Sequence, residues 1–252
     1  MDRTKAVDSE QTYSSYSTTT AFSLGTNPLA MRFGVDEAGK GPVLGSMFAA
    51  AVLADPSALP EDVGDSKGIS ADRRETMAAE IRDVAERVAV AEIPVWEIDD
   101  EETDMNTLTV VAHARALSQL CVGGQAVKQN GSGDLSGFVD AGDTNAVRFG
   151  QRLRDRVDAE LDLRAEHEAD ENHRIVGAAS VIAKVARDAH VEALSAKYGE
   201  VGSGYPSDPT TRDFLEEYVE TYDELPDCAR ESWQTSKDAL AAAAQASLDA
   251  FE

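Results

Sequence analysis

Apolar residues fall into short runs separated by turn residues, and this pattern begins at Met31. Residues 31–35 read MRFGV, and a mostly apolar run from Val43 to Ala54 follows a turn that contains Gly39 and Gly41. Runs of this length, bounded by glycine and proline, are typical of buried strands. We therefore predict two strands here, with the second returning antiparallel to the first.

Helical spacing alternates with further strand-like runs through the middle of the chain. Ser70 is placed to cap a helix that continues to Glu86, and residues 88–95 then alternate like a strand. An apolar helix is predicted over 106–120, and residues 135–140 form a short strand that ends in a carboxylate. This order is typical of an α/β or mixed α+β protein whose sheet is flanked by helices.

The last part of the chain is predicted to be mostly helical. Thr144 is placed to cap a helix that carries Val147, Phe149 and Leu153, and residues 161–167 form a strand that leads into more acids. Further helices are predicted over about 173–197, over 210–222 and from residue 238 onward. We therefore expect the sheet to be followed by a helical C-terminal part.

The two ends of the chain differ from its centre. Residues 1–30 are rich in Ser and Thr and lack a sustained period, which predicts a disordered extension. Because Met31 directly precedes the first strand, one hypothesis is that translation starts there, and N-terminal sequencing of the native protein would test it. The folded body is expected to span 31–235, and an alanine-rich helical tail to span 236–252.

The charge of the chain bears on its partners. Among 252 residues, 47 Asp and Glu face 23 Lys and Arg, for a net charge of -24. This balance argues against a simple electrostatic DNA binder, whose affinity comes from basic residues. The acids are spread along the whole length, a pattern that resembles adaptation to high salt, where repulsion from phosphates is screened. The charge therefore indicates a high-salt habitat rather than the kind of partner that the protein binds.

Other function classes receive little support. Cys121 and Cys228 are the only cysteines and lie far apart, so neither a zinc site nor a disulfide framework is indicated. No apolar run approaches the ~18 residues of a membrane span, and the N-terminus lacks a basic region followed by an apolar core. We expect a cytoplasmic protein of globular type that acts as a monomer.

Acids recur where the predicted strands end. Asp36 and Glu37 follow the first strand, Asp140 ends another, and Asp170 follows the run over 161–167. Neighbouring strands would bring these carboxylates together, and hard divalent cations such as Mg²⁺ or Mn²⁺ would relieve their repulsion. Two such ions could activate a water and stabilise the leaving oxygen of a phosphodiester. On the first stretch alone, a solvated acidic turn is equally consistent.

The turn Gly39-Lys40-Gly41 follows the first acid pair directly. Glycine permits close approach of backbone N–H groups to a ligand, and Lys40 adds one cation. A phosphate beside a metal site suggests phosphoryl chemistry.

Six motifs together resemble the ribonuclease HII family of archaeal type. DEAGKGP and GSGYPSDP are very specific, whereas DSK alone would mean little. The resemblance covers roughly residues 31–235 and implies a ribonuclease H-like fold and an endonuclease that cuts RNA in RNA–DNA hybrids. The motifs are DEAGKGP at Asp36 to Pro42, DSK at Asp65 to Lys67, VDAGD at Val139 to Asp143, HEAD at His167 to Asp170, AASVIAKVARD at Ala178 to Asp188, and GSGYPSDP at Gly202 to Pro209.

The resemblance also implies roles for individual residues. The four metal ligands would be Asp36, Glu37, Asp140 and Asp170. The turn Gly39-Lys40-Gly41 would read the ribose 2′-hydroxyl together with Tyr205, and cleavage on the 5′ side of a ribonucleotide, including one embedded in duplex DNA, would leave 3′-hydroxyl and 5′-phosphate ends. Positions that match phosphate-facing residues of the family are Ser66, Lys67, Ser180 and Lys184.

Plainer interpretations stand beside these roles. Ser180 and Lys184 suit a packed small residue and a solvated lysine of one helix, and Tyr205 suits a packed aromatic. Asp143 and Asp188 are interpreted as structural or surface acids rather than ligands.

The C-terminal end resembles a sliding-clamp-binding box, Gln-x-x-aliphatic-x-x-aromatic-aromatic. Gln245, Leu248 and Phe251 match it, whereas Glu252 replaces the last aromatic residue. A frayed alanine-rich tail is the alternative.

Two competing functions remain open from sequence. A DNA-specific nuclease or recombinase could share the fold, but it would give no reason for the Gly-Lys-Gly turn and Tyr205. A non-catalytic acidic protein that mimics nucleic acid or buffers cations predicts diffuse acids rather than carboxylates at converging strand ends.

Overall fold

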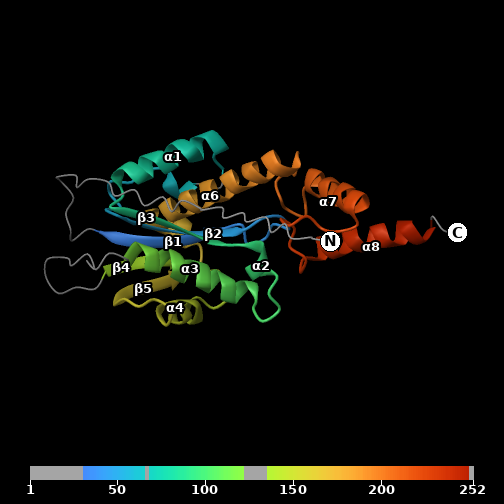
Figure 1. Ribbon diagram of the computed structural model, residues 1–252. Coiled ribbons are helices and arrows are strands. Elements are labelled where there is room, and N and C mark those ends of the chain that lie inside the picture. The colour runs from blue at the N-terminus through green and yellow to red at the C-terminus, as the bar shows by residue number, and fades with distance from the viewer. Residues whose placement is uncertain (1–30, 66–67, 122–134, 250–252) are drawn as a thin grey trace, which may run out of the picture.

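A computed structural model describes residues 31–65, 68–121 and 135–249. Its centre is a five-stranded mixed sheet in the order β3-β2-β1-β4-β5, with helices on both faces (Figure 1). The first three strands pair antiparallel, and β4 and β5 continue the sheet parallel to β1. The strands are β1 (Arg32–Ala38), β2 (Met47–Ala54), β3 (Arg87–Ile93), β4 (Leu135–Asp140) and β5 (Leu161–Glu166).

Each face of the sheet is buried by its own helices. Helix α6 (Arg174–Tyr198) packs on one face with α1 (Ala71–Val84), and α3 (Met105–Cys121) packs on the other with α4 (Ala146–Arg154) (Figure 1). Strand β2 is buried along its whole length, which explains its nearly continuous apolar sequence. Short helices are η2 (Val63–Asp65), α2 (Val95–Ile98) and α5 (Ala169–Asn172).

A third apolar cluster joins the turn after β1 to the end of the chain. Helices α7 (Pro209–Tyr222) and α8 (Gln234–Asp249) pack together beyond the end of the sheet (Figure 1). Val43 and Leu44 are buried in the same cluster as Phe214. The C-terminal part therefore supports the segment that follows the first acid pair.

Most of the elements predicted from sequence are confirmed, and Ser70 does cap α1 by accepting the Arg73 N–H. One correction concerns β2, which begins at Met47 because the N–H groups of Val43 and Leu44 donate to the Gly204 carbonyl instead.

The expected start of α4 was also wrong. Asn145, rather than Thr144, caps α4 by accepting the Arg148 N–H at 2.9 Å, and the Thr144 hydroxyl instead bonds to Asp143. Val147 points to solvent with 71% of its surface exposed.

Asp170 lies in the one-turn helix α5 rather than at a strand end. Helix α8 begins at Gln234, ahead of the expected residue 238, so it crosses the predicted boundary at 235.

Some predictions fall outside the described residues. These are the extension over 1–30, and Ser66, Lys67 and Phe251. In the described ranges, no helix combines the length and apolar character that crossing a membrane requires.

Gly34 is where sheet and helix approach most closely, and it generates a stability prediction. A Cβ at Gly34 would lie 2.2 Å from the Ile175 carbonyl oxygen of α6, a backbone atom that cannot rotate away. We expect Gly34→Ala to lower the free energy of unfolding by about 2–3 kcal/mol, as overpacking does. Urea unfolding followed by circular dichroism measures this change. Gly68→Ala is the control, since its Cβ meets nothing within 4 Å, and equal stability of the two variants would contradict the packing.

Candidate active site

Strand alternation sends the first two acids to opposite faces of the sheet. Asp36 shares the face of Gly34, toward α6, whereas Glu37 faces α3. There the Glu37 Oε2 atom lies 2.7 Å from Nε2 of His113, a fully buried residue that sequence reasoning missed. Its only sequence signal is a histidine within an apolar helix. The two neighbours in sequence therefore have different surroundings.

Asp36 is buried among other acids, and its pKa is strongly raised. It is only 6% exposed, and its Oδ1 atom accepts the Glu37 N–H at 2.8 Å. Burial raises the pKa of Asp36 well above its usual value, and the charges of Glu37 and Asp140 raise it further. The Ser180 hydroxyl faces Asp36 and partly offsets this rise, although its geometry falls short of a hydrogen bond. Ionised Asp36 therefore lacks a cationic partner among the described residues.

Asp140 and Asp170 complete the acid cluster. The Asp140 Oδ1 atom accepts the Ala169 N–H at 2.8 Å, which ties the end of β4 to the start of α5. Burial raises the pKa of Asp140; the Ala169 bond opposes this rise, and the charges of Glu37 and Asp170 add to it. Asp140 thus interacts electrostatically with each of the other three predicted acids, which lie on β1 and α5.

The cluster suits a divalent cation by its chemistry. Its donors are carboxylate oxygens, two of its acids are nearly buried, and their mutual repulsion raises pKa values that a bound cation would lower. In the described ranges, no three His, Cys, Asp or Glu side chains are arranged as a metal-binding group. Asp36 and Asp140 each accept a backbone N–H at one carboxylate oxygen, and Glu37 contacts His113 through Oε2 alone.

A pocket of about 370 Å³ opens beside the acids. Its wall contains the whole predicted recognition turn, and Glu37 belongs both to this wall and to the acid cluster. Four cations and two acids line it, and Asp188 pairs with Arg74 at 2.9 Å and with Arg187 at 3.3 Å. The wall therefore keeps a positive balance on a chain of net charge -24, which favours an anionic ligand. The lining residues predicted from sequence are Glu37, Gly39, Lys40, Gly41, Lys184 and Tyr205, and the others are Ala38, Arg74, Arg187 and Asp188.

Two lining side chains are fixed by identifiable contacts. The Lys40 Nζ atom donates to the Gly142 carbonyl and lies 3.2 Å from the Asn106 Oδ1 atom. Tyr205 is 39% exposed at the pocket wall, with the Arg187 guanidinium 5.0 Å from its ring centroid. The packed-aromatic interpretation of Tyr205 is therefore wrong.

Ser180 requires a correction. It is fully buried on the face of α6 that meets the sheet, so it lies beneath Asp36 and does not face a phosphate at the surface. One turn further along α6, Lys184 does line the pocket, as predicted.

Arg230 is a second residue that sequence reasoning missed, because it lies in none of the recognised motifs. It is fully buried, and its guanidinium donates to the carbonyls of Gly39, Lys40 and Gly45 at 2.6, 3.0 and 2.9 Å. Burial lowers the pKa of Arg230 to about 10. Trp233 Nε1 donates to the Gly41 carbonyl at 3.3 Å. Residues from the C-terminal part of the chain thus hold the carbonyls of the recognition turn in place.

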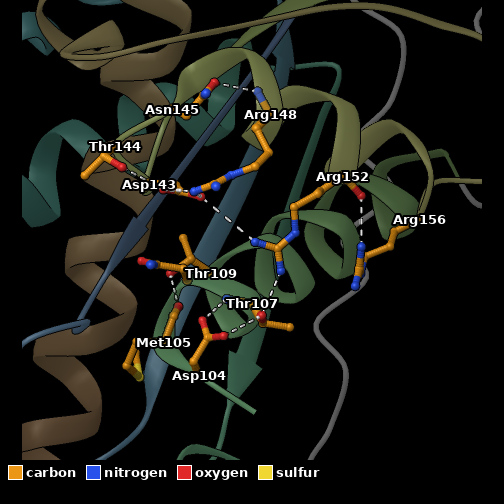
Figure 2. Close-up of polar contacts among 12 residues, drawn as sticks. Asp104, Met105, Thr107, Thr109, Asp143, Thr144, Asn145, Arg148, Arg152 and Arg156 are labelled. Carbon is orange, nitrogen blue, oxygen red and sulfur yellow. Dashed lines mark hydrogen bonds and ion pairs between the residues drawn. The ribbon is translucent and has the colours of Figure 1, made fainter.

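Asp143 belongs to a separate network, although it shares a motif with Asp140 (Figure 2). Its carboxylate oxygens lie 2.7 and 2.8 Å from one Arg148 nitrogen, and one oxygen is 4.0 Å from Arg152. The bonds from Arg148 hold the pKa of Asp143 below its usual value. Arg152 also donates to the Thr107 hydroxyl at 2.7 Å. Asp143 therefore ties the loop after β4 to α4, and Arg152 ties α4 to α3, which agrees with the interpretation of Asp143 as a structural acid.

Comparisons with known proteins agree with this arrangement. The family model for ribonuclease HII matches residues 33–236. A ribonuclease HII from the halophilic archaeon Haloarcula marismortui is 63% identical over 221 residues, which cover 88% of this chain and 100% of that protein.

Solved structures show the same fold. The ribonuclease H2 of Pyrococcus horikoshii is 33% identical with a TM-score of 0.73, and the match covers 85% of this chain and 99% of that one. A ribonuclease HII of Archaeoglobus fulgidus, solved in complex with PCNA, is 33% identical with a TM-score of 0.68 and coverages of 81% and 95%. The expected ribonuclease H-like fold is confirmed.

The raised pKa of Asp36 generates a prediction with a definite sign. The folded state holds the Asp36 proton more tightly than the unfolded state does, so the free energy of unfolding falls as pH rises from about 4 through the folded pKa. Asp36→Asn lacks this titration. With metal ions removed by chelator, we expect the variant to be more stable than wild type at pH 7 and to lose that advantage below about pH 4.

Urea unfolding at a series of pH values measures this difference. Asp143→Asn is the matched control with the opposite sign, because its lowered pKa contributes stability at pH 7 that is lost as pH falls. A lower stability of Asp36→Asn than wild type at pH 7 would contradict the account of Asp36.

Proposed function

The chain belongs to the ribonuclease HII family and is an endoribonuclease that cuts RNA in RNA–DNA hybrids, and from this premise we propose that Asp36, Glu37, Asp140 and Asp170 hold its catalytic metal ions. The family uses divalent metal ions, and Mg²⁺ or Mn²⁺ suits a donor set made of carboxylates. When bound, such ions would activate a water and stabilise the leaving oxygen of the cleaved phosphodiester.

One observation carries the proposal. Glu37 belongs both to the acid cluster and to the basic pocket, so the proposed metal site adjoins the pocket that the proposed recognition turn lines. A ribonucleotide bound against the turn would place its phosphate next to the acids. Recognition and cleavage would then act on the same nucleotide.

The recognition turn is suited to reading a ribose. The Arg230 guanidinium donates hydrogen bonds to the carbonyls of Gly39 and Lys40, which fixes the turn without using its backbone N–H groups. We infer that these N–H groups and Tyr205 contact the 2′-hydroxyl, the group that distinguishes RNA from DNA. Lys40 stands where the family commonly has arginine; it keeps the charge but lacks the planar fork. Because reading by backbone groups does not use that fork, the substitution preserves recognition.

The basic wall of the pocket would hold the nucleic-acid backbone. Lys184, Arg187 and Arg74 line it, and the two arginines, which pair with Asp188 in this structure, would contact phosphates beside the turn. Ser66 and Lys67, which lie outside the described residues, are proposed to contact substrate phosphates as well. The substrates are an RNA–DNA hybrid and duplex DNA that contains a single ribonucleotide, cut on its 5′ side to give 3′-hydroxyl and 5′-phosphate ends.

Cleavage of a defined duplex tests this function. At high KCl with Mg²⁺ or Mn²⁺, we expect a duplex with one ribonucleotide to be cut at its 5′ side, as mapped on a sequencing gel. Asp140→Asn and Asp170→Asn should abolish the cut, because each removes a proposed ligand. Asp143→Asn is the matched control within the same motif and should retain cleavage, since Asp143 pairs with Arg148. Cutting of all-DNA duplex at the same rate would instead favour a DNA-specific nuclease.

The C-terminal box is proposed to bind a sliding clamp, as the A. fulgidus relative binds PCNA in its solved complex. Helix α8 extends to Asp249, so Gln245 and Leu248 lie in its last turns, while Phe251 is outside the described residues. The C-terminal end of α8 points away from the sheet (Figure 1). Clamp binding there would leave the pocket open to substrate.

Binding to the sliding clamp of the same organism tests this proposal. We expect Phe251→Ala to weaken the affinity measured by surface plasmon resonance at least about tenfold, since buried aromatic anchors dominate such interfaces. Glu252→Ala is the control, because Glu252 departs from the box. Equal affinities for wild type and Phe251→Ala would contradict the clamp proposal.

A further inference from the structure

His113 is the one histidine of α3 and lies in the middle of an apolar face. Its ring is fully buried, with Ala112, Ala116 and Leu117 as buried neighbours on the same helix and the edge of Phe149 5.2 Å away between ring centroids. An imidazole is a costly choice for such a position, because burying a polar ring requires compensation.

The compensation is confined to one side of the ring. Nε2 lies 2.7 Å from the Glu37 Oε2 atom, and Nδ1 is buried without a hydrogen-bond partner among the described residues. An ionised carboxylate only accepts hydrogen bonds. Nε2 is therefore the protonated ring nitrogen, and it donates a hydrogen bond to Glu37. A buried Nδ1 without a hydrogen-bond partner destabilises the fold, so His113 is not explained by stability alone. A functional role would explain it.

The other Glu37 oxygen is also confined. A Cβ at Gly142 would lie 3.0 Å from the Glu37 Oε1 atom and 2.5 Å from the Thr109 methyl group, so glycine at this position leaves room for the carboxylate. Glu37 therefore sits between His113 on α3 and the loop after β4. A carboxylate held at one oxygen has a restricted set of rotamers and a defined direction for the other oxygen.

We propose that His113 is the positioning residue of Glu37, holding this carboxylate by one oxygen so that it can serve the proposed divalent-cation site at the strand ends. The inference rests on the proposed function, because it assumes that Glu37 serves that site. Hydrogen-bonding partners of metal ligands typically contribute about 10- to 100-fold to metal affinity. His113 does not touch the ion or the substrate in this proposal; it acts through Glu37 alone.

Binding of Mn²⁺ alone, followed by electron paramagnetic resonance on substrate-free protein at high KCl, tests the inference. We expect His113→Leu to weaken Mn²⁺ binding by about 10- to 100-fold, since it removes the donor while keeping an apolar fit. His113→Gln should stay within about threefold of wild type, because its amide nitrogen can occupy the place of Nε2. If His113→Leu does not fold, His113→Asn replaces it, since its shorter amide cannot reach Glu37.

Leu117→Ala controls for a general loosening of the helix. Leu117 is fully buried one turn further along α3, so its truncation destabilises the protein without touching Glu37. Unchanged Mn²⁺ binding by His113→Leu, an equal loss with Leu117→Ala, or a loss with His113→Gln as large as with His113→Leu would each overturn the inference. Asp140→Asn separates the two proposals, because unchanged Mn²⁺ binding by that variant would instead refute the metal site itself.

Discussion

Four carboxylates share the ends of two strands and one short helix, where water is partly excluded and like charges repel. Burial and mutual repulsion raise the pKa values of Asp36 and Asp140, and the surrounding backbone N–H groups offset this only in part. The rest of the fold is what keeps the cluster together: α6 closes on β1 at Gly34, and α3 supports Glu37 from the opposite face. The packing energy of the sheet thus maintains a charge arrangement that no isolated segment would adopt.

Local chemistry explains how much of this was predictable from sequence. Strand runs and turn glycines are local signals, so the sheet and its acid-tipped ends were predicted well, and the family motifs located Glu37, Lys184 and Tyr205. What failed depends on distant partners. Val43 and Leu44 have the composition of a strand but pair with the loop at Gly204, and Ser180 has the spacing of a surface contact but lies beneath Asp36.

His113 and Arg230 escaped prediction for the same physical reason. A histidine in an apolar helix and an arginine near the C-terminus are ordinary in sequence. Their roles can be recognised only from the oxygen atoms that they contact in the folded protein. Glu37 is 76 residues from His113, and the Gly39 carbonyl is 191 residues from the Arg230 guanidinium. Each is the kind of buried polar contact that is satisfied only in the complete tertiary structure.

The hydrogen bonds of Arg230 also bear on the order in which parts of the chain can fold during synthesis. Residues 39–45 leave the ribosome early, whereas the guanidinium that fixes their carbonyls arrives only when nearly the whole chain has been made. Contacts of such separation are among the last to be closed during folding, since the intervening chain must first be ordered. The turn that would recognise a ribose therefore lacks these three hydrogen bonds until the segment around Arg230 has been synthesised.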